Sequence, residues 1–357
     1  MRPQSDLKRA NQRKVIRLIA TKAAITRVEL AKLTGLTKMT ITNLVNEWIN
    51  DGILKEDKAP ADNNRGRPKM ILRFSNKAPK IIGVMIQQNR ITLSIGNLSG
   101  EIEKSWSKTI GENDPIVIVD DLINNLLSEY INTTFLLASY INVDGSPYEN
   151  VIDFIEKKIN IEIYQGTEND AILSYEHLRN AKIKSDNVLL INLNQDISSS
   201  YLGEEKDRTP IRPNLGHVSI DYNGLSCPCG RKGCLNAYIS KPVMEKKMRD
   251  ISKMKLDFAG FCQLQNKKND SKIDWVFKDM MEKLGHGISN VLMVVNIDSV
   301  VLSGELQYIP DRYISKLEKD LRVSSNQDNL IVRKSSLTKS EETVLPIYYG
   351  IKKYLNL

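Results

Sequence analysis

The chain has 357 residues, of which 41% are hydrophobic and 26% charged, which is typical of a globular protein with two or three domains. No apolar run reaches the eighteen or so residues of a membrane span, and Asp6 and Lys8 exclude the apolar region of a signal peptide. We therefore expect a cytoplasmic protein without a membrane partner.

The excess positive charge is confined to the N-terminal fifth of the chain. Residues 1–75 hold 16 Lys and Arg against 7 Asp and Glu, a net charge of +9, whereas the whole chain carries +8. The remainder is therefore close to neutral, at −1. A basic head on a neutral body is typical of phosphate binding, although a basic segment alone is often only a solvated surface.

Residues 5–49 predict a helix-turn-helix. Residues 5–20 place apolar side chains close to helical spacing. Thr26 and Glu29 have the spacing of a capping box before a short helix over 28–34, which should stop at Gly35 because glycine tolerates the left-handed conformation. A third helix follows, capped by Thr37, with a buried stripe formed by Ile41, Leu44, Val45, Trp48 and Ile49.

The polar face of this third helix is the candidate for reading bases. Its first two turns hold mostly short, donor-rich side chains of the kind that contact base edges in the major groove. The predicted DNA-binding residues here are Thr37, Lys38, Met39, Thr40, Thr42 and Asn43. The alternative is a solvated face on a small helical domain, but the order of capped helices around a glycine turn favours DNA.

Two extended segments then predict a wing. Residues 53–55 and 70–74 have the character of strands, and the polar loop between them contains Arg65-Gly66-Arg67-Pro68. Arginines in such a loop suit a minor groove or backbone phosphates, so Arg65 and Arg67 complete the predicted interface. Residues 1–75 are thus interpreted as a winged helix-turn-helix whose partner is a double-stranded DNA operator.

The rest of the chain alternates strands and helices, which predicts an α/β body. Residues 80–86, 90–95 and 101–109 have the pattern of three strands separated by turns. A helical segment follows at 117–130, and a later apolar run at 188–193 predicts a buried strand.

Three of the four cysteines crowd into one short segment, which predicts a metal site. Cys227, Cys229 and Cys234 lie close to the upstream His217, and three thiolates with one imidazole form a closed tetrahedral set for structural zinc. A disulfide is the competing explanation, but it is disfavoured in the cytosol and by the one-residue spacing between Cys227 and Cys229. Cys262 is expected to be a buried apolar residue instead.

These motifs together resemble the ROK family (repressor, open reading frame, kinase), and within it the sugar-responsive repressors for xylose and N-acetylglucosamine. The resemblance covers nearly the whole chain, and the Gly-His and Cys-x-Cys-Gly-x-x-Gly-Cys-Leu motif at 216–235 is its most specific part. It implies a two-lobed, actin-like (ribonuclease-H-like) ROK domain after the head. The implied lobes are 76–185, small, and 186–357, large, with the last helix returning to the small lobe.

Kinases of this family carry Asp-x-Gly-x-Thr in the first hairpin, and here the resemblance breaks. Met85 stands at the aspartate position and Gln87 at the glycine position. A thioether cannot help to hold Mg²⁺, and a side chain at the glycine position blocks the close approach of phosphate to the backbone. The second phosphate loop, residues 192–200, has no glycine, and Gly304 stands where kinases usually have two. We therefore predict no catalytic residues, no enzyme activity and no ATP.

The resemblance also implies a sugar pocket. Glu168-Asn169-Asp170-Ala171 is similar to the family's Asn-Asp motif, although a helix-capping pair is the alternative. Amides stand at two positions where the family has glutamates, and these amides favour a modified, N-acetylated or anionic ligand over an ordinary hexose. The predicted effector-binding residues are Asn169, Asp170, Asn214, His217 and Asn236.

The sequence thus predicts a homo-oligomeric repressor, a dimer or tetramer, controlled by a sugar or sugar derivative bound between the lobes. Two alternatives remain open. One is an active sugar kinase with a DNA-binding head, and the other is a regulator whose body only dimerises or binds a protein partner.

Overall fold

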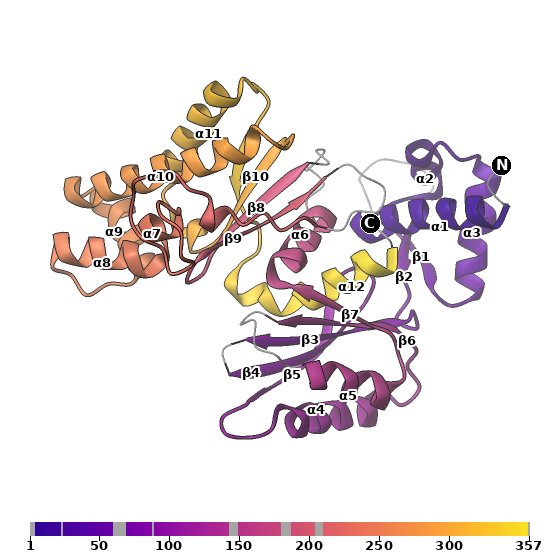
Figure 1. The fold of residues 1–357 in the computed structure, drawn as a ribbon. Coiled ribbons are helices and arrows are strands. Elements are labelled where there is room, and N and C mark those ends of the chain that lie inside the picture. The colour runs from indigo at the N-terminus through magenta and orange to yellow at the C-terminus, as the bar shows by residue number, and fades with distance from the viewer. Residues whose placement is uncertain are drawn as a thin grey trace. The chain divides into compact units, whose positions relative to one another are not determined.

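A computed structural model describes residues 4–22, 24–59, 69–87, 89–142, 149–179, 187–203 and 210–355. The chain divides into two compact units, Met1–Ala181 with Lys339–Leu357, and Lys182–Thr338 (Figure 1). No helix in these described ranges is long and apolar enough to cross a membrane.

The N-terminal part of the first unit is a three-helix domain followed by a two-stranded antiparallel sheet. Its elements are α1 (Gln4–Thr21), α2 (Arg27–Thr34), α3 (Lys38–Asn50), β1 (Leu54–Lys58) and β2 (Met70–Phe74). The predicted capping box is confirmed, since Thr26 Oγ1 accepts from the Glu29 backbone and Glu29 Oε2 accepts from the Thr26 backbone. Gly35 ends α2 with φ of 71°, as predicted.

The stripe predicted for α3 forms the centre of this domain. Ile41, Leu44, Val45 and Trp48 are buried, while Ile49 is half-buried. α3 contacts α2 and β1, while α1 contacts α2 and β2, so the three helices and the two strands pack as one domain. Burial of this stripe places the opposite side of the helix in solvent.

A five-stranded sheet forms the rest of the first unit, in the order β5-β4-β3-β6-β7. The first three strands are antiparallel, and β6 and β7 continue in parallel. The strands are β3 (Lys80–Gln87), β4 (Arg90–Gly96), β5 (Ile102–Thr109), β6 (Phe135–Asn142) and β7 (Ile163–Thr167). The three antiparallel strands lie where the sequence predicted them.

Helices cover both faces of this sheet (Figure 1). On one face lie α4 (Pro115–Glu129) and α5 (Glu149–Ile159), packed over a core that includes Val84, Leu93 and Tyr140. On the other face α12 (Leu345–Leu355) packs along β3, β6 and α6 (Glu168–Arg179), so the end of the chain lies within the first unit. A short helix, η3 (Lys339–Val344), precedes α12.

The second unit holds a four-stranded sheet in the order β11-β10-β8-β9. Its antiparallel β8–β9 hairpin continues in parallel through β10 and β11, which repeats the pattern of β3, β4, β6 and β7. The strands are β8 (Val188–Leu193), β9 (Ile197–Leu202), β10 (Ser299–Gly304) and β11 (Ile331–Lys334). The buried strand predicted at 188–193 is confirmed.

Helices form most of the core around this second sheet. They are η1 (Leu215–His217), α7 (Asn236–Ile239), α8 (Lys241–Ser252), α9 (Phe258–Lys268), α10 (Ser271–Leu292), η2 (Glu305–Tyr308) and α11 (Asp311–Ser325). Phe277 of α10 stacks on Tyr313 of α11 with ring centroids 5.4 Å apart. Cys262 is fully buried in this core, and burial raises the pKa of its thiol, in agreement with the prediction of an apolar role.

Candidate functional site

The exposed side of α3 presents the residues predicted to contact DNA. Lys38 and Asn43 are exposed, and Met39 is 69% exposed despite its apolar side chain. Thr42 is half-buried. A convex helix face with a cation, an amide and an apolar tip has the donors and the methyl-contacting group that read base edges in a major groove.

Two threonines at the start of α3 also have a structural role. The Thr37 hydroxyl accepts from the Thr40 backbone N–H at 3.1 Å and lies 2.9 Å from the Thr40 hydroxyl. The predicted N-cap is therefore confirmed. Part of the hydrogen-bonding capacity of these hydroxyls is used within the helix, which fixes the orientation of the reading face.

Arg27 is a further positioning residue that sequence reasoning missed. Its guanidinium donates to Glu56 Oε1 of β1 at 2.8 Å and to Asn46 Oδ1 of α3 at 2.8 Å. It thereby joins α2, α3 and the first strand of the sheet. Its place directly after the N-cap of α2 gave no signal for this role, because both partners are distant in sequence.

The two strands that support the predicted wing are present as an antiparallel pair. Leu54 pairs with Phe74 and Lys58 with Met70. The loop arginines predicted to contact DNA, Arg65 and Arg67, lie outside the described residues. The DNA-binding residues therefore remain a prediction. The structure gives the exposure only of those at the start of α3, and not of the two arginines in the loop.

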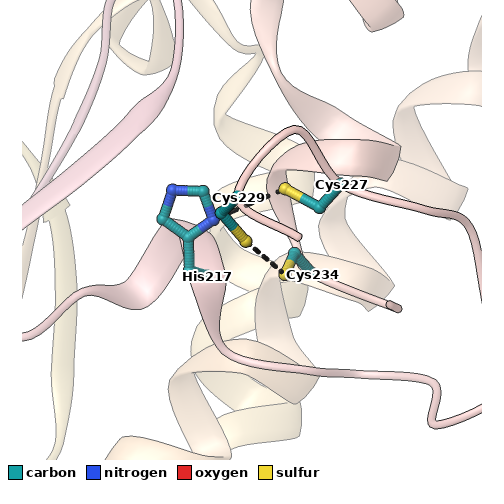
Figure 2. Close-up of side chains that lie close together, drawn as sticks. All are labelled: His217, Cys227, Cys229 and Cys234. Carbon is teal, nitrogen blue, oxygen red and sulfur yellow. Dashed lines mark hydrogen bonds between the residues drawn. The ribbon is translucent and has the colours of Figure 1, made fainter. Parts of the chain in front are cut away.

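Figure 2 shows the second candidate site, where His217, Cys227, Cys229 and Cys234 converge. Their ligand atoms all lie within 4.8 Å of one another. Cys227 Sγ is 3.5 Å from His217 Nδ1, and Cys229 Sγ is 3.6 Å from Cys234 Sγ. A zinc tetrahedron places two sulfurs about 3.8 Å apart and a sulfur and a nitrogen about 3.5 Å apart. The cluster therefore has the spacing and the ligand types to hold a metal ion.

The loop between the cysteines is folded tightly by its backbone. The Cys227 N–H donates to the Arg231 carbonyl at 2.8 Å, and the Gly230 N–H donates back to the Cys227 carbonyl at 3.0 Å. Gly233 has φ of 70° and lies against the Asp221 backbone, where a Cβ would collide. All four cysteines of the chain are free thiols, so the structure gives the disulfide alternative no support.

The thiols differ in their acidity before any metal binds. Burial, together with hydrogen bonds with the other two thiols, raises the pKa of Cys234 to about 12. A hydrogen bond from the Arg231 backbone lowers the pKa of the exposed Cys229 thiol. A cation that binds thiolates must therefore displace a tightly held proton from Cys234.

The residues predicted to bind an effector lie in both units. In the first unit, Asn169 and Asp170 begin α6 and are buried. Asp170 Oδ2 accepts from the Thr167 backbone at 3.2 Å, and the Asp170 N–H donates to Thr167 Oγ1 at 3.3 Å. Asp170 thus has the helix-capping role that was the alternative interpretation, and its role toward a ligand stays a prediction.

In the second unit the predicted residues surround η1. Asn214 is exposed at its start, and His217 at its end faces the cysteines. Asn236 is buried, and its Oδ1 accepts from the Ile197 N–H at 2.8 Å, which ties α7 to β9. Asn236 therefore has a structural role, and whether any of these three contacts a ligand stays a prediction.

Positions that resemble kinase phosphate contacts are filled by internal packing. Met85 is a buried member of β3, and Gln87 Nε2 lies 3.4 Å from Glu342 Oε2 of η3. In the second unit Gly304 has φ of 63°, and a Cβ there would collide with the end of β8. The positive φ and the close packing both favour glycine at this last position of β10.

Comparisons with known proteins agree with this architecture. The ROK family model matches residues 127–343. The xylose repressor of Bacillus subtilis (strain 168) is 23% identical over 325 residues, covering 85% of this chain and 84% of that protein. The DNA-binding transcriptional dual regulator NagC of Escherichia coli (strain K12) is 20% identical over 332 residues, covering 84% and 81%.

Two solved structures show the fold. A crystal structure of a ROK family transcriptional regulator, a homologue of the E. coli MLC protein, matches with a TM-score of 0.78 and 19% identity over 98% of this chain and 97% of its own. A ROK hexokinase from Thermus thermophilus matches 77% of this chain and 99% of its own, with a TM-score of 0.64 and 14% identity. The predicted fold, a winged helix-turn-helix followed by an actin-like ROK domain, is confirmed.

Proposed function

The chain belongs to the ROK family, and from this premise we propose that it is a DNA-binding transcriptional repressor controlled by a sugar or sugar derivative. The observation that carries the proposal is the solvated face of α3, with Lys38, Met39 and Asn43 presented on a capped helix. The names of the relatives, xylose repressor and DNA-binding transcriptional dual regulator NagC, support it.

In this proposal two copies of the chain place their α3 helices in successive major grooves of a pseudo-palindromic operator. Lys38, Met39, Thr42 and Asn43 contact base edges, while Thr37 and Thr40 orient the start of the helix. Arg65 and Arg67 supply the wing contacts to the minor groove or to phosphates. Dimers and tetramers both satisfy this geometry.

The proposed effector contacts are Asn169 and Asp170 in the first unit, and Asn214, His217 and Asn236 in the second. Hydroxyl groups of a sugar pair with carboxylates and amides, since the first accept and the second both donate and accept. The effector changes DNA binding only if it binds one state of the protein more tightly than the other.

The metal proposed for the cysteine cluster is zinc in a structural role. Three sulfurs and one imidazole nitrogen match its preferred donors, and four protein ligands leave no position for a reacting water. The ion would hold the loop that carries His217, whose second ring nitrogen is then oriented for another contact.

Kinase activity is the competing function, and the filled phosphate positions argue against it. Met85 offers no oxygen to Mg²⁺, and Gln87 has a side chain where the family's kinases have glycine. Incubation with ATP and a panel of sugars tests this directly. We expect ADP release no faster than in protein-free controls, and sugar-dependent ADP release would contradict the proposal.

The function is tested by selecting DNA from a random library with the full chain, followed by footprinting. We expect enrichment of a two-fold symmetric site and protection of two major grooves on one side of the duplex. A thermal-shift screen with sugars and sugar phosphates then identifies the effector, because a ligand of the folded state raises the unfolding midpoint. Failure to enrich any sequence would refute the DNA-binding role, whereas a silent sugar screen would favour a body that only dimerises or binds a protein.

A further inference from the structure

Helix α6 connects the predicted effector motif to the DNA-binding domain. Asn169 and Asp170 form its first turn, and His177 lies in its last turn. His177 Nε2 is 2.7 Å from Arg17 Nη2 of α1, across 160 residues of sequence. Because a guanidinium can only donate, His177 Nε2 is the acceptor of this hydrogen bond.

The residues around this contact hold both helices in place. α1 contacts α6 and α12, so the body of the unit is the docking surface for the first helix of the DNA-binding domain. The Thr21 hydroxyl donates to the Arg17 carbonyl at 2.8 Å, which secures the last turn of α1. Arg17 and His177 are both half-buried, so the hydrogen bond is partly shielded from water.

α6 has the properties of a rigid transmitter. Nine of its twelve residues are buried. Tyr175 meets Tyr348 of α12 edge to face, with ring centroids 4.9 Å apart, and Arg179 forms an ion pair with Glu341 at 3.3 Å. From Asp170 to His177 the helix rises about 10 Å, or two turns. Close-packed interiors do not absorb small displacements, so a shift of the first turn moves the last turn with it.

We propose that the Arg17–His177 hydrogen bond couples effector binding to the DNA-binding domain, with α6 as the moving element. This inference rests on the proposed function, because it assumes that Asn169 and Asp170 contact the effector. Helix shifts in regulatory proteins are about 1–2 Å. The Arg17 Nη2–His177 Nε2 distance is 2.7 Å, and a shift of α6 by about 1 Å along this direction lengthens it beyond hydrogen-bonding distance. In one state α6 therefore holds α1 through this bond, and in the other state it does not.

The test uses His177→Leu, which removes the acceptor, and His177→Gln as the matched control, because the glutamine oxygen can replace Nε2. Operator affinity of the full chain is measured by fluorescence anisotropy with and without D-xylose or N-acetyl-D-glucosamine. The wild-type ratio of the two affinities should be about 5–150. We expect the ratio of operator affinities with and without sugar to fall to about 1 in His177→Leu, while the variant still binds the sugar. His177→Gln should keep most of the wild-type ratio.

Arg17→Met provides an independent variant, which removes the donor from the other side of the contact. If the two residues act through each other, the Arg17→Met/His177→Leu double variant loses no more coupling than either single variant. A wild-type response that His177→Leu and Arg17→Met both retain overturns the coupling role alone. A wild-type protein that binds its operator but responds to neither sugar overturns the proposed effector assignment, and the coupling inference with it.

Discussion

Removal of the proposed zinc ion is the perturbation that tests the cysteine cluster most directly. Two ligands lie next to core residues, since Leu215 precedes His217 by two positions and Leu235 follows Cys234. Both leucines are fully buried in the core of the second unit. A cluster without its ion no longer fixes the chain segments that insert these side chains.

The expected loss follows from that burial. Exposing a buried leucine costs about 1.5–3 kcal/mol, so loosening both costs about 3–6 kcal/mol. Binding of an ion to the folded state alone gives a free energy close to the lower end of this range, because an ion present at 100 times its dissociation constant adds about 2.7 kcal/mol to the free energy of unfolding. For a unit of this size about 3 kcal/mol corresponds to a fall in Tm of roughly 6–12 °C.

The assay is calorimetry of the full chain before and after dialysis against a chelator, with the metal content measured by mass spectrometry. Cys234→Ser should lose the metal, whereas Cys262→Ser, at an equally buried cysteine outside the cluster, should keep one ion per chain. Acid should also release the ion, because protons compete for thiolates. Protein purified without any bound metal, with a Tm that chelation leaves unchanged, would falsify the structural-zinc assignment.

Three further outcomes are expected. Asn43→Ala should weaken operator binding about 5- to 150-fold without lowering Tm, whereas Asn50→Ala, exposed at the other end of α3, should leave affinity unchanged in anisotropy titrations. Thr26→Ala should cost about 0.5–2 kcal/mol in urea unfolding of the full chain. Hydrogen bonds from the Thr26 backbone and hydroxyl lower the pKa of Glu29, so part of this difference should be present at pH 7 and lost as pH falls through the lowered pKa; a constant difference contradicts the hydrogen bond from the Thr26 hydroxyl to the Glu29 carboxylate. Phe277→Ala should destabilise the second unit by about 3–5 kcal/mol, and a loss below 1 kcal/mol would show that its stacking on Tyr313 is unimportant.

Local sequence patterns predicted the DNA-binding domain and the metal cluster well, because both are built from short-range chemistry. The Thr26–Glu29 capping box and the Gly35 terminator each depend on residues within a few positions of one another. The cysteines lie within eight residues, and glycine turns bring them together with His217. Such features need no knowledge of how distant elements pack.

Long-range contacts escaped prediction for the opposite reason. Arg27 resembles any solvated arginine until β1 and α3 bring Glu56 and Asn46 to it. Nothing near His177 indicates that Arg17 lies beside it. Asp170 is an intermediate case, since its sequence motif allowed both a ligand contact and a helix cap, and only the geometry displays the cap.

The phosphate positions suggest how a catalytic scaffold can serve as a regulator. Phosphoryl transfer requires metal and phosphate contacts held in a fixed geometry. A switch requires only that a ligand prefer one of two packed states. Gln87 bonds to Glu342 within the first unit, and Gly304 closes on the end of β8 within the second. The contact of Gln87 with Glu342 places a side chain where the family's kinases have glycine, which a repressor tolerates and a kinase does not. Substituting Met85→Asp and Gln87→Gly should therefore not restore ADP release, because the glycine-free loop at 192–200 still offers no second cradle for phosphate.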